Sequence, residues 1–226
     1  KSYLGLDLSG MSAALVGIDG LTLGAYDAGV KVNQASDTDN NAATTPAKLN
    51  WTTFFSNTTG LTPASIPQVG AGVEIEVQGS VVLDAFGVVL AKGSFKVQLG
   101  TVTEKGANHV LGGGDDTRYQ AMVLTLGTGA FSGATAVDVF IGVGGVIEDH
   151  PGGAATPSVY SDDAINVDAG LGFHATLNSL SLVTLKNNNG TPTVATDDKS
   201  YLGLDLSGLS AALVGIDGLT LGAYDA

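Results

Sequence analysis

Two stretches of the chain are nearly identical. Residues 1–28 and residues 199–226 have the same sequence except at one position, where the first copy has Met11 and the second has Leu209. A fixed period constrains the whole fold, because a repeat is usually a unit that buries its apolar surface against its neighbours. We therefore predict a tandem array, in which residues 1–198 form one complete β-repeat unit and residues 199–226 start the next. A coincidental duplication is the alternative.

Most of the chain alternates apolar and polar residues with a period of two, which is typical of β-strands. Two such runs flank Asp19-Gly20, a dipeptide that favours a tight hairpin turn. Residues 2–34 are therefore predicted to form one long hairpin. Similar alternation predicts a second hairpin over 73–99 with its turn at 85–87. A third is predicted over 122–143 with its turn at 132–133, and a fourth over 165–185 with its turn at 178–179.

Glycine is frequent, with 33 residues in 226, and one lies near the middle of almost every predicted arm. Glycine inside a strand marks a bulge or a tight bend. We predict an all-β fold of long antiparallel hairpins bent at these glycines, so that the sheet rolls over its apolar face into a solenoid-like rod of tandem repeats. The alternative is a string of β-sandwich beads. The glycines concerned are Gly10, Gly24, Gly79, Gly93, Gly129, Gly142 and Gly170.

The segment 35–71 breaks the alternation and contains the run LNWTTFF. Its aromatic residues are Trp51, Phe54 and Phe55. Large aromatic side chains are usually buried, so we interpret them as a plug for the core. An exposed patch that binds glycans is the alternative.

Charge and missing motifs exclude several functions. The net charge is −13, so a phosphate backbone would be repelled and nucleic acid is not an expected partner. The chain has no cysteine, which excludes disulfides and thiolate metal sites. The histidines His109, His150 and His174 follow no catalytic spacing, and we expect no enzymatic activity. No apolar run approaches the roughly 18 residues that a membrane helix needs.

Acidic residues in loops are the candidates for metal binding. Carboxylate oxygens on glycine-rich or asparagine-rich loops suit Ca²⁺, which takes about 6 to 8 oxygen ligands. Solvated turns are the alternative interpretation of the same residues. The predicted calcium ligands are Asp37, Asp39, Asp115, Asp116, Asp162 and Asp163.

The segments GLTLGAYDAGVKVNQAS at 20–36 and KLNWTTF at 48–54 carry a resemblance. They resemble the long β-repeats of giant bacterial surface or secreted proteins, which are often described as adhesin-like. The resemblance implies an extracellular, cell-surface location and a structural role as part of a fibre, filament or stalk in cell–cell or cell–surface contact. Neighbouring repeats and surface or matrix glycans are the partners it implies. A glycan-binding or calcium-binding module of a secreted protein is the alternative function.

Overall fold

The computed structural model describes residues 1–37, 46–61, 67–111, 115–156, 159–187, 198–217, 219 and 221–224. These ranges form an almost entirely β structure, and none of their helices is long and apolar enough to span a membrane. The elements are β1 (Ser2–Leu15), β2 (Leu21–Ser36), α1 (Trp51–Phe54), the 3₁₀ turn η2 (Phe55–Asn57), β3 (Val73–Ala85), β4 (Val89–Glu104), β5 (Thr117–Gly127), β6 (Val137–Val143), β7 (Val146–Glu148), β8 (Ala164–Asn166), β9 (Leu171–Asn187), β10 (Lys199–Val214) and β11 (Leu221–Ala223).

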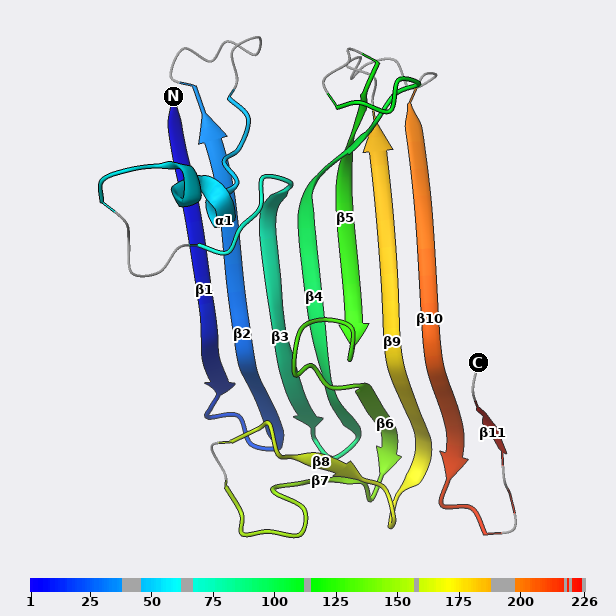
Figure 1. Ribbon diagram of the computed structural model, residues 1–226. Helices are drawn as coiled ribbons and strands as arrows, with labels where there is room; N and C mark the ends of the chain where they lie inside the picture. The colour runs from blue at the N-terminus through cyan, green and yellow to red at the C-terminus, as the bar shows by residue number, and fades with distance from the viewer. Residues whose placement is uncertain are drawn as a thin grey trace.

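Nine strands form one antiparallel sheet in the order β1-β2-β3-β4-β5-β9-β10-β11, and β6 pairs with β4 and β9. Figure 1 shows the first strand at one side of this sheet and the C-terminal strands at the other. The strands β7 and β8 form a separate two-stranded sheet near one end of the long strands. The predicted all-β class is therefore confirmed.

The first two predicted hairpins are present. Strand β1 pairs with β2, and β3 pairs with β4 around the turn at 85–87. Each run of alternating residues became a strand that pairs with its neighbour in sequence, as tight turns favour.

The third predicted hairpin is wrong. Strands β5 and β6 both pair antiparallel with β4 and with β9, and not with each other. They follow one another along a single strand position between two longer strands of 16 and 17 residues. The loop between them leaves the sheet and is fixed to β4, where the Thr135 amide donates to Ser94 Oγ at 2.8 Å. Alternation identified the strands correctly, but it carries no information about which strands pair.

The fourth predicted hairpin is also wrong. Residues 171–187 form one continuous strand through Asn178-Ser179, with no reversal. The Asn178 carbonyl accepts a hydrogen bond at 2.9 Å from the Thr128 amide, at the point where β5 gives way to β6. Because β9 has neighbouring strands on both sides, its hydrogen bonds to those strands outweigh the local turn preference of these two residues. Of the glycines named above, Gly129 and Gly170 lie outside the strands.

A glycine with positive φ interrupts the regular strand at the equivalent position of both copies of the repeat. Gly10 has φ 67° and its equivalent Gly208 has φ 63°. The β1–β2 register shifts between Leu8 and Met11. The alternation of apolar residues changes phase by one residue at the same point, from Leu8 to Met11. The bulge therefore keeps both halves of the apolar pattern on one side of the sheet.

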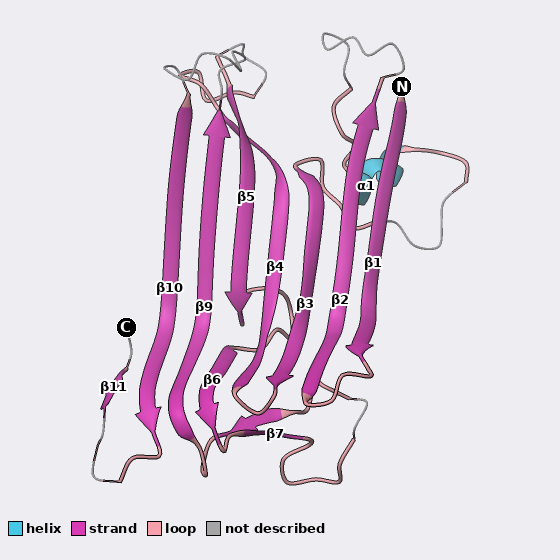
Figure 2. Ribbon diagram, turned by 180° about the vertical axis from the view of Figure 1, so that it is seen from behind, coloured by secondary structure: helices cyan, strands magenta, loops and turns pink. Residues whose placement is uncertain are grey.

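The two faces of the sheet differ. The covered face carries α1 and the loops around β7 and β8, and it includes the fully buried side chains of Val82, Leu90 and Phe140. Figure 2 looks onto the opposite side, here called the open face, which no helix or second sheet of the described residues covers. A row of directly paired residues on the open face crosses seven strands and consists of Leu8, Val30, Val77, Val97, Leu124, Leu182 and Leu204.

Candidate functional site

The two copies of the duplicated sequence adopt the same local structure. In the first copy Ala13 pairs with Ala25 and Leu15 pairs with Leu23. In the second copy the equivalent residues pair in the same way, Ala211 with Ala223 and Leu213 with Leu221. The turn is also repeated, with Leu21 N donating to Ile18 O at 3.2 Å and Leu219 N to Ile216 O at 3.1 Å. The same sequence therefore folds into the same hairpin at both edges of the sheet.

What differs is the neighbour on the other side. Strand β10 pairs with β9 from Lys199↔Asn187 to Val214↔Gly172, along its whole length. Strand β1, which has the sequence of β10 apart from Met11, pairs with β2 alone among the described residues. An unpaired edge presents a row of N–H and C=O groups to another strand. At β10, this sequence pairs with β9 along the edge that is unpaired in β1. A strand like β9 therefore fits the edge of β1.

The bulge glycine shows the same contrast. A Cβ placed on Gly208 would lie 2.7 Å from Asn178 Cβ of β9, whereas one placed on Gly10 would meet nothing within 4 Å. Both residues have positive φ, which favours glycine on conformational grounds alone. The close approach of β9 is a second reason for glycine, because a side chain at Gly208 would overlap Asn178. Within the described chain, this reason applies only to the second copy.

The segment 46–70 is anchored to the covered face of β1 and β2. The Trp51 ring lies on Gly5, where a Cβ would be 2.5 Å from the ring. Its Nε1 donates to Asn33 Oδ1 at 3.1 Å, and Asn33 Nδ2 donates to the carbonyls of Leu49 and Gly70 at 2.8 and 3.0 Å. Asn33 is 1% exposed, so these bonds satisfy a buried carboxamide.

Only part of the aromatic run is covered. Trp51 is half-buried against the sheet, while Phe54 is 40% exposed and contacts Phe55 edge-on with ring centroids 5.2 Å apart. Trp51 thus covers the sheet, and Phe54 extends from the same short helix toward solvent. A glycan-binding role for these rings stays a prediction.

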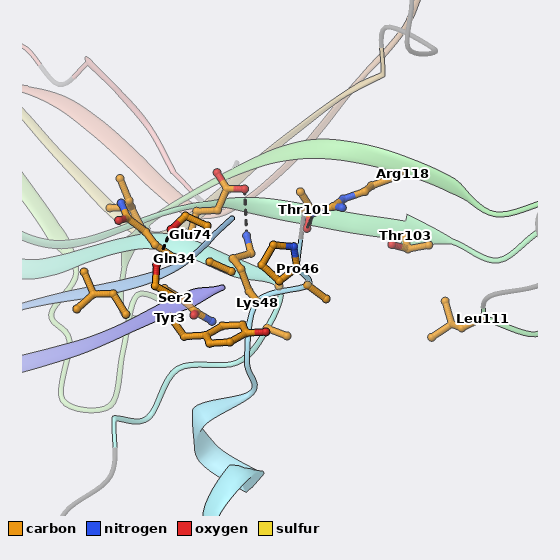
Figure 3. Close-up of a pocket in the computed structure, with 18 residues that line it drawn as sticks. Ser2, Tyr3, Gln34, Pro46, Lys48, Glu74, Thr101, Thr103, Leu111 and Arg118 are labelled. Carbon is orange, nitrogen blue, oxygen red and sulfur yellow. Dashed lines mark hydrogen bonds and ion pairs between the residues drawn. The ribbon is translucent and has the colours of Figure 1, made fainter. Parts of the chain in front are cut away.

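An open pocket of about 1120 Å³ lies at the end of the sheet where β3 begins later than its neighbours. Figure 3 shows its polar lining, which comes from the five strands β1 to β5 and from the segment before α1. Lys48 and Glu74 form an ion pair of 3.0 Å within it. Arg118, the third charged residue of the lining, donates to Thr101 Oγ1 at 3.4 Å. Two of the three charged side chains in the pocket are therefore paired with each other.

The predicted calcium ligands lie in separate loops. Asp39 lies outside the described residues, and Asp37 lies just after β2. Asp115 accepts hydrogen bonds from the side chain and amide of Asn108 at 2.8 and 3.3 Å, and Asp116 accepts one from the Gly106 amide at 3.3 Å. These bonds join the two described parts of this loop, residues 105–111 and 115–116.

Asp162 and Asp163 lie together with a third carboxylate that sequence reasoning missed. Oxygens of Asp149, Asp162 and Asp163 lie within 4.8 Å of one another. Thr156 joins the first two, with its amide donating to Asp149 Oδ1 at 2.8 Å and its hydroxyl to Asp162 Oδ2 at 2.7 Å. Asp149 follows Glu148 and lies far from Asp162 and Asp163 in the sequence, so only the fold of the chain between β7 and β8 brings it to the other two.

A resident cation faces this acidic cluster. Lys92 of β4 donates from Nζ to the main-chain carbonyls of Ser161, at 3.1 Å, and Asp163. Burial lowers the pKa of Lys92, and the charges of Asp163, Asp162 and Asp138 oppose that shift. Burial also raises the pKa of Asp163, which the Lys92 ammonium opposes. The lysine therefore fixes the acidic loop to the sheet.

Two histidines bind carboxylates on neighbouring segments. His150 Nδ1 lies 2.5 Å from Asp162 Oδ2, and hydrogen bonds from His150 and Thr156 lower the pKa of Asp162. His174 Nε2 of β9 lies 2.7 Å from Asp138 Oδ1 of β6. The first contact fixes the loop between β7 and β8, and the second joins two paired strands.

No family model, curated protein or solved structure matches this chain.

Proposed function

We propose that the chain is a structural repeat of an elongated extracellular bacterial fibre, stalk or adhesin. In this proposal residues 1–198 are one unit, and successive units share one continuous antiparallel sheet. The fibre then places the molecule's outer end at a distance from the cell, for contact with other cells or surfaces. The extracellular and adhesive parts of the proposal depend on the sequence resemblance, and the continuous sheet depends on the strand pairing.

The pairing of β10 with β9 carries the proposal. The strand that begins the second copy adds to the last strand of the first unit, and it also starts the next hairpin in the register of β1 and β2. In an array, the edge of each unit is thereby covered by the next unit, which removes an exposed strand edge. Bead-like domains would instead need a connecting linker and closed edges.

The register fixes how successive units are related. The paired row that begins at Leu8 ends at Leu204, and Leu204 is equivalent to Leu6. The row that begins at Leu15 ends at Ala211, which is equivalent to Ala13. Both halves of the sheet therefore slip by the same two residues per unit, roughly 7 Å along the strands. A constant slip allows the sheet to coil regularly into the rod that the sequence predicts.

Electron microscopy of the parent protein on its native cells tests this function. Thin filaments that bind an antibody raised against residues 1–226, and that are lost when the gene segment is deleted, support it. Labelling confined to the cell interior overturns it.

Calcium binding by the loop between β7 and β8 is a second candidate function. Asp162 Oδ1 is buried without a hydrogen-bond partner, beside the carboxylates of Asp149 and Asp163. This donor set suits Ca²⁺, although the nearby Lys92 ammonium competes with it for the same charges. Calorimetric titration with CaCl₂ tests the site, with Asp149→Asn as the variant and Asp205→Asn, an exposed carboxylate of β10, as the control. Binding that is equal in both variants excludes this cluster.

A further inference from the structure

The open face is apolar across the full width of the sheet. Beside the row defined above, the next paired row is Leu6, Val32, Ile75, Leu99, Met122, Thr184 and Leu202. Several side chains of the open face are strongly exposed, with Leu202 at 71%, Leu204 at 63% and Phe173 at 62%. The paired residues on this face between the rows of Leu6 and Leu15 include no Asp, Glu, Lys or Arg.

The charged residues that pair within the long strands lie elsewhere, and Asp27 lies unpaired at the β2 bulge. On the covered face Lys31 forms an ion pair of 3.1 Å with Glu76, and Gln98 donates to the same carboxylate at 2.6 Å. On the open face, Arg118 and Lys186 lie beyond the apolar rows, at the end near the pocket. The open face therefore has an apolar centre with polar residues at one rim, the usual arrangement of a protein–protein interface.

The apolar area is larger than a free monomer normally exposes. Ten residues along a strand span about 33 Å, and the six spacings from β1 to β10 span about 29 Å, which gives roughly 950 Å². The largest apolar patch of a typical monomer is about 300–600 Å². Neither α1 nor the β7–β8 sheet reduces this area, because both lie over the covered face.

We propose that the open face is the interface with a second copy of this sheet, packed face to face. Two such faces bury about 1,900 Å² in total, which lies within the range of stable, specific interfaces. Rows of Leu and Val on antiparallel strands suit aligned sheet packing, with the two sheets about 10 Å apart. This inference builds on the proposed fibre and makes the fibre two sheets thick.

A second sheet fits this face better than a lipid surface does. The chain carries a net charge of −13, and bacterial membrane surfaces are also anionic, so electrostatics opposes their approach. Two copies of the chain also repel each other, but their charges lie away from the contact and are screened by salt. Association of the two sheets should therefore strengthen as the salt concentration rises.

Sedimentation velocity of the full chain tests the proposal over about 0.1–100 µM. We expect a concentration-dependent dimer of the 22.6 kDa chain. Leu204→Lys and Phe173→Lys place an unpaired charge in the interface and should each raise the dimer Kd by about a hundredfold or more. Leu61→Lys is the matched control, because Leu61 is 93% exposed in a loop away from the face, and it should leave the Kd unchanged. Circular dichroism checks that each variant remains folded.

Each other outcome contradicts the proposal. A chain that stays monomeric at 100 µM overturns it, as does a dimer that both lysine variants leave intact. Binding of the monomer to liposomes through this face would identify lipid as its occupant instead. A peptide with the sequence of residues 171–187 should bind the edge of β1 and leave the dimer intact. If this peptide dissociates the dimer, the two copies are paired through their strand edges and the proposal is wrong. A dimer that passes these tests stands even if the tandem-array proposal fails.

Discussion

A chain that ends at residue 198 should polymerise head to tail. Removal of residues 199–226 exposes the edge of β9, while the edge of β1 is already free. Strand β9 should keep its shape, because β5 and β6 pair with its other side from Lys186 to Leu171. Strand β1 of a second molecule then has the sequence of the lost β10, with Met11 in place of Leu209.

The strength of this contact follows from the β9–β10 register, which runs from Lys199↔Asn187 to Val214↔Gly172. It comprises about 15 residue pairs, and a net contribution of about 1 kcal/mol for each ladder hydrogen bond gives about 15 kcal/mol. Association of two preformed sheets costs about 8 kcal/mol, in the middle of the accepted range. The remaining 7 kcal/mol corresponds to a Kd of about 10 µM.

Size-exclusion chromatography with light scattering measures this assembly from 1 to 300 µM. The shortened chain should form a ladder of oligomers that grows with concentration. A synthetic peptide of residues 199–214 should cap β9 and stop the growth, whereas a scrambled peptide should not. A shortened chain that gives a full strand signal by circular dichroism, yet shows no oligomers beyond those of the full chain at 300 µM, refutes the edge pairing.

Three further predictions concern the stability of this chain. Trp51→Ala removes the ring from Gly5 and a donor from Asn33 Oδ1, and it should lower the free energy of urea unfolding by about 3 kcal/mol; an unchanged midpoint means that the ring does not hold the segment. Gly208→Ala should accelerate amide exchange in β9 and β10 more than Gly10→Ala does in β1. The overlap with β9 should lower the free energy of local opening by roughly an extra 1–3 kcal/mol. Equal effects of the two substitutions would contradict the contact. The hydrogen bond to Glu104 raises the pKa of Tyr119 to about 12, above its usual 10, so its stabilising contribution is complete below pH 10 and lost as the pH rises through 12. Thermal unfolding of the Tyr119→Phe variant should lack this alkaline loss, and an identical pH profile would exclude the hydrogen bond as its cause.

The sequence predicts strands well and their partners poorly. Alternation located the long strands except β9, which it divided at 178–179. Asp19-Gly20 and the 85–87 turn located two hairpins, because these signals are local. The pairing of β5 and β6 with β4 and β9 was not predictable, since it depends on the lengths of strands far apart in sequence. Asn178-Ser179 illustrates the same limit, because a local turn preference gives way when strands lie on both sides.

The candidate sites show a similar division. The duplication pointed directly to β10 as a cover for β9, since identical sequences favour identical hairpins. The cluster of Asp149 with Asp162 and Asp163 was only partly predictable, because its members come from two ends of a folded loop. The open face was present in the alternation itself, but alternation does not indicate which face the chain leaves uncovered.

A cryo-electron microscopy structure of a chain with two complete units in tandem tests the central claim most directly. Six strand positions separate β1 from β10, so the sheet should run without interruption and repeat every 29 Å or so. The first strand of the second unit should pair with β9 on one side and with its own hairpin partner on the other. Two closed domains at variable angles, with the edge of β9 unpaired at the junction, would contradict it.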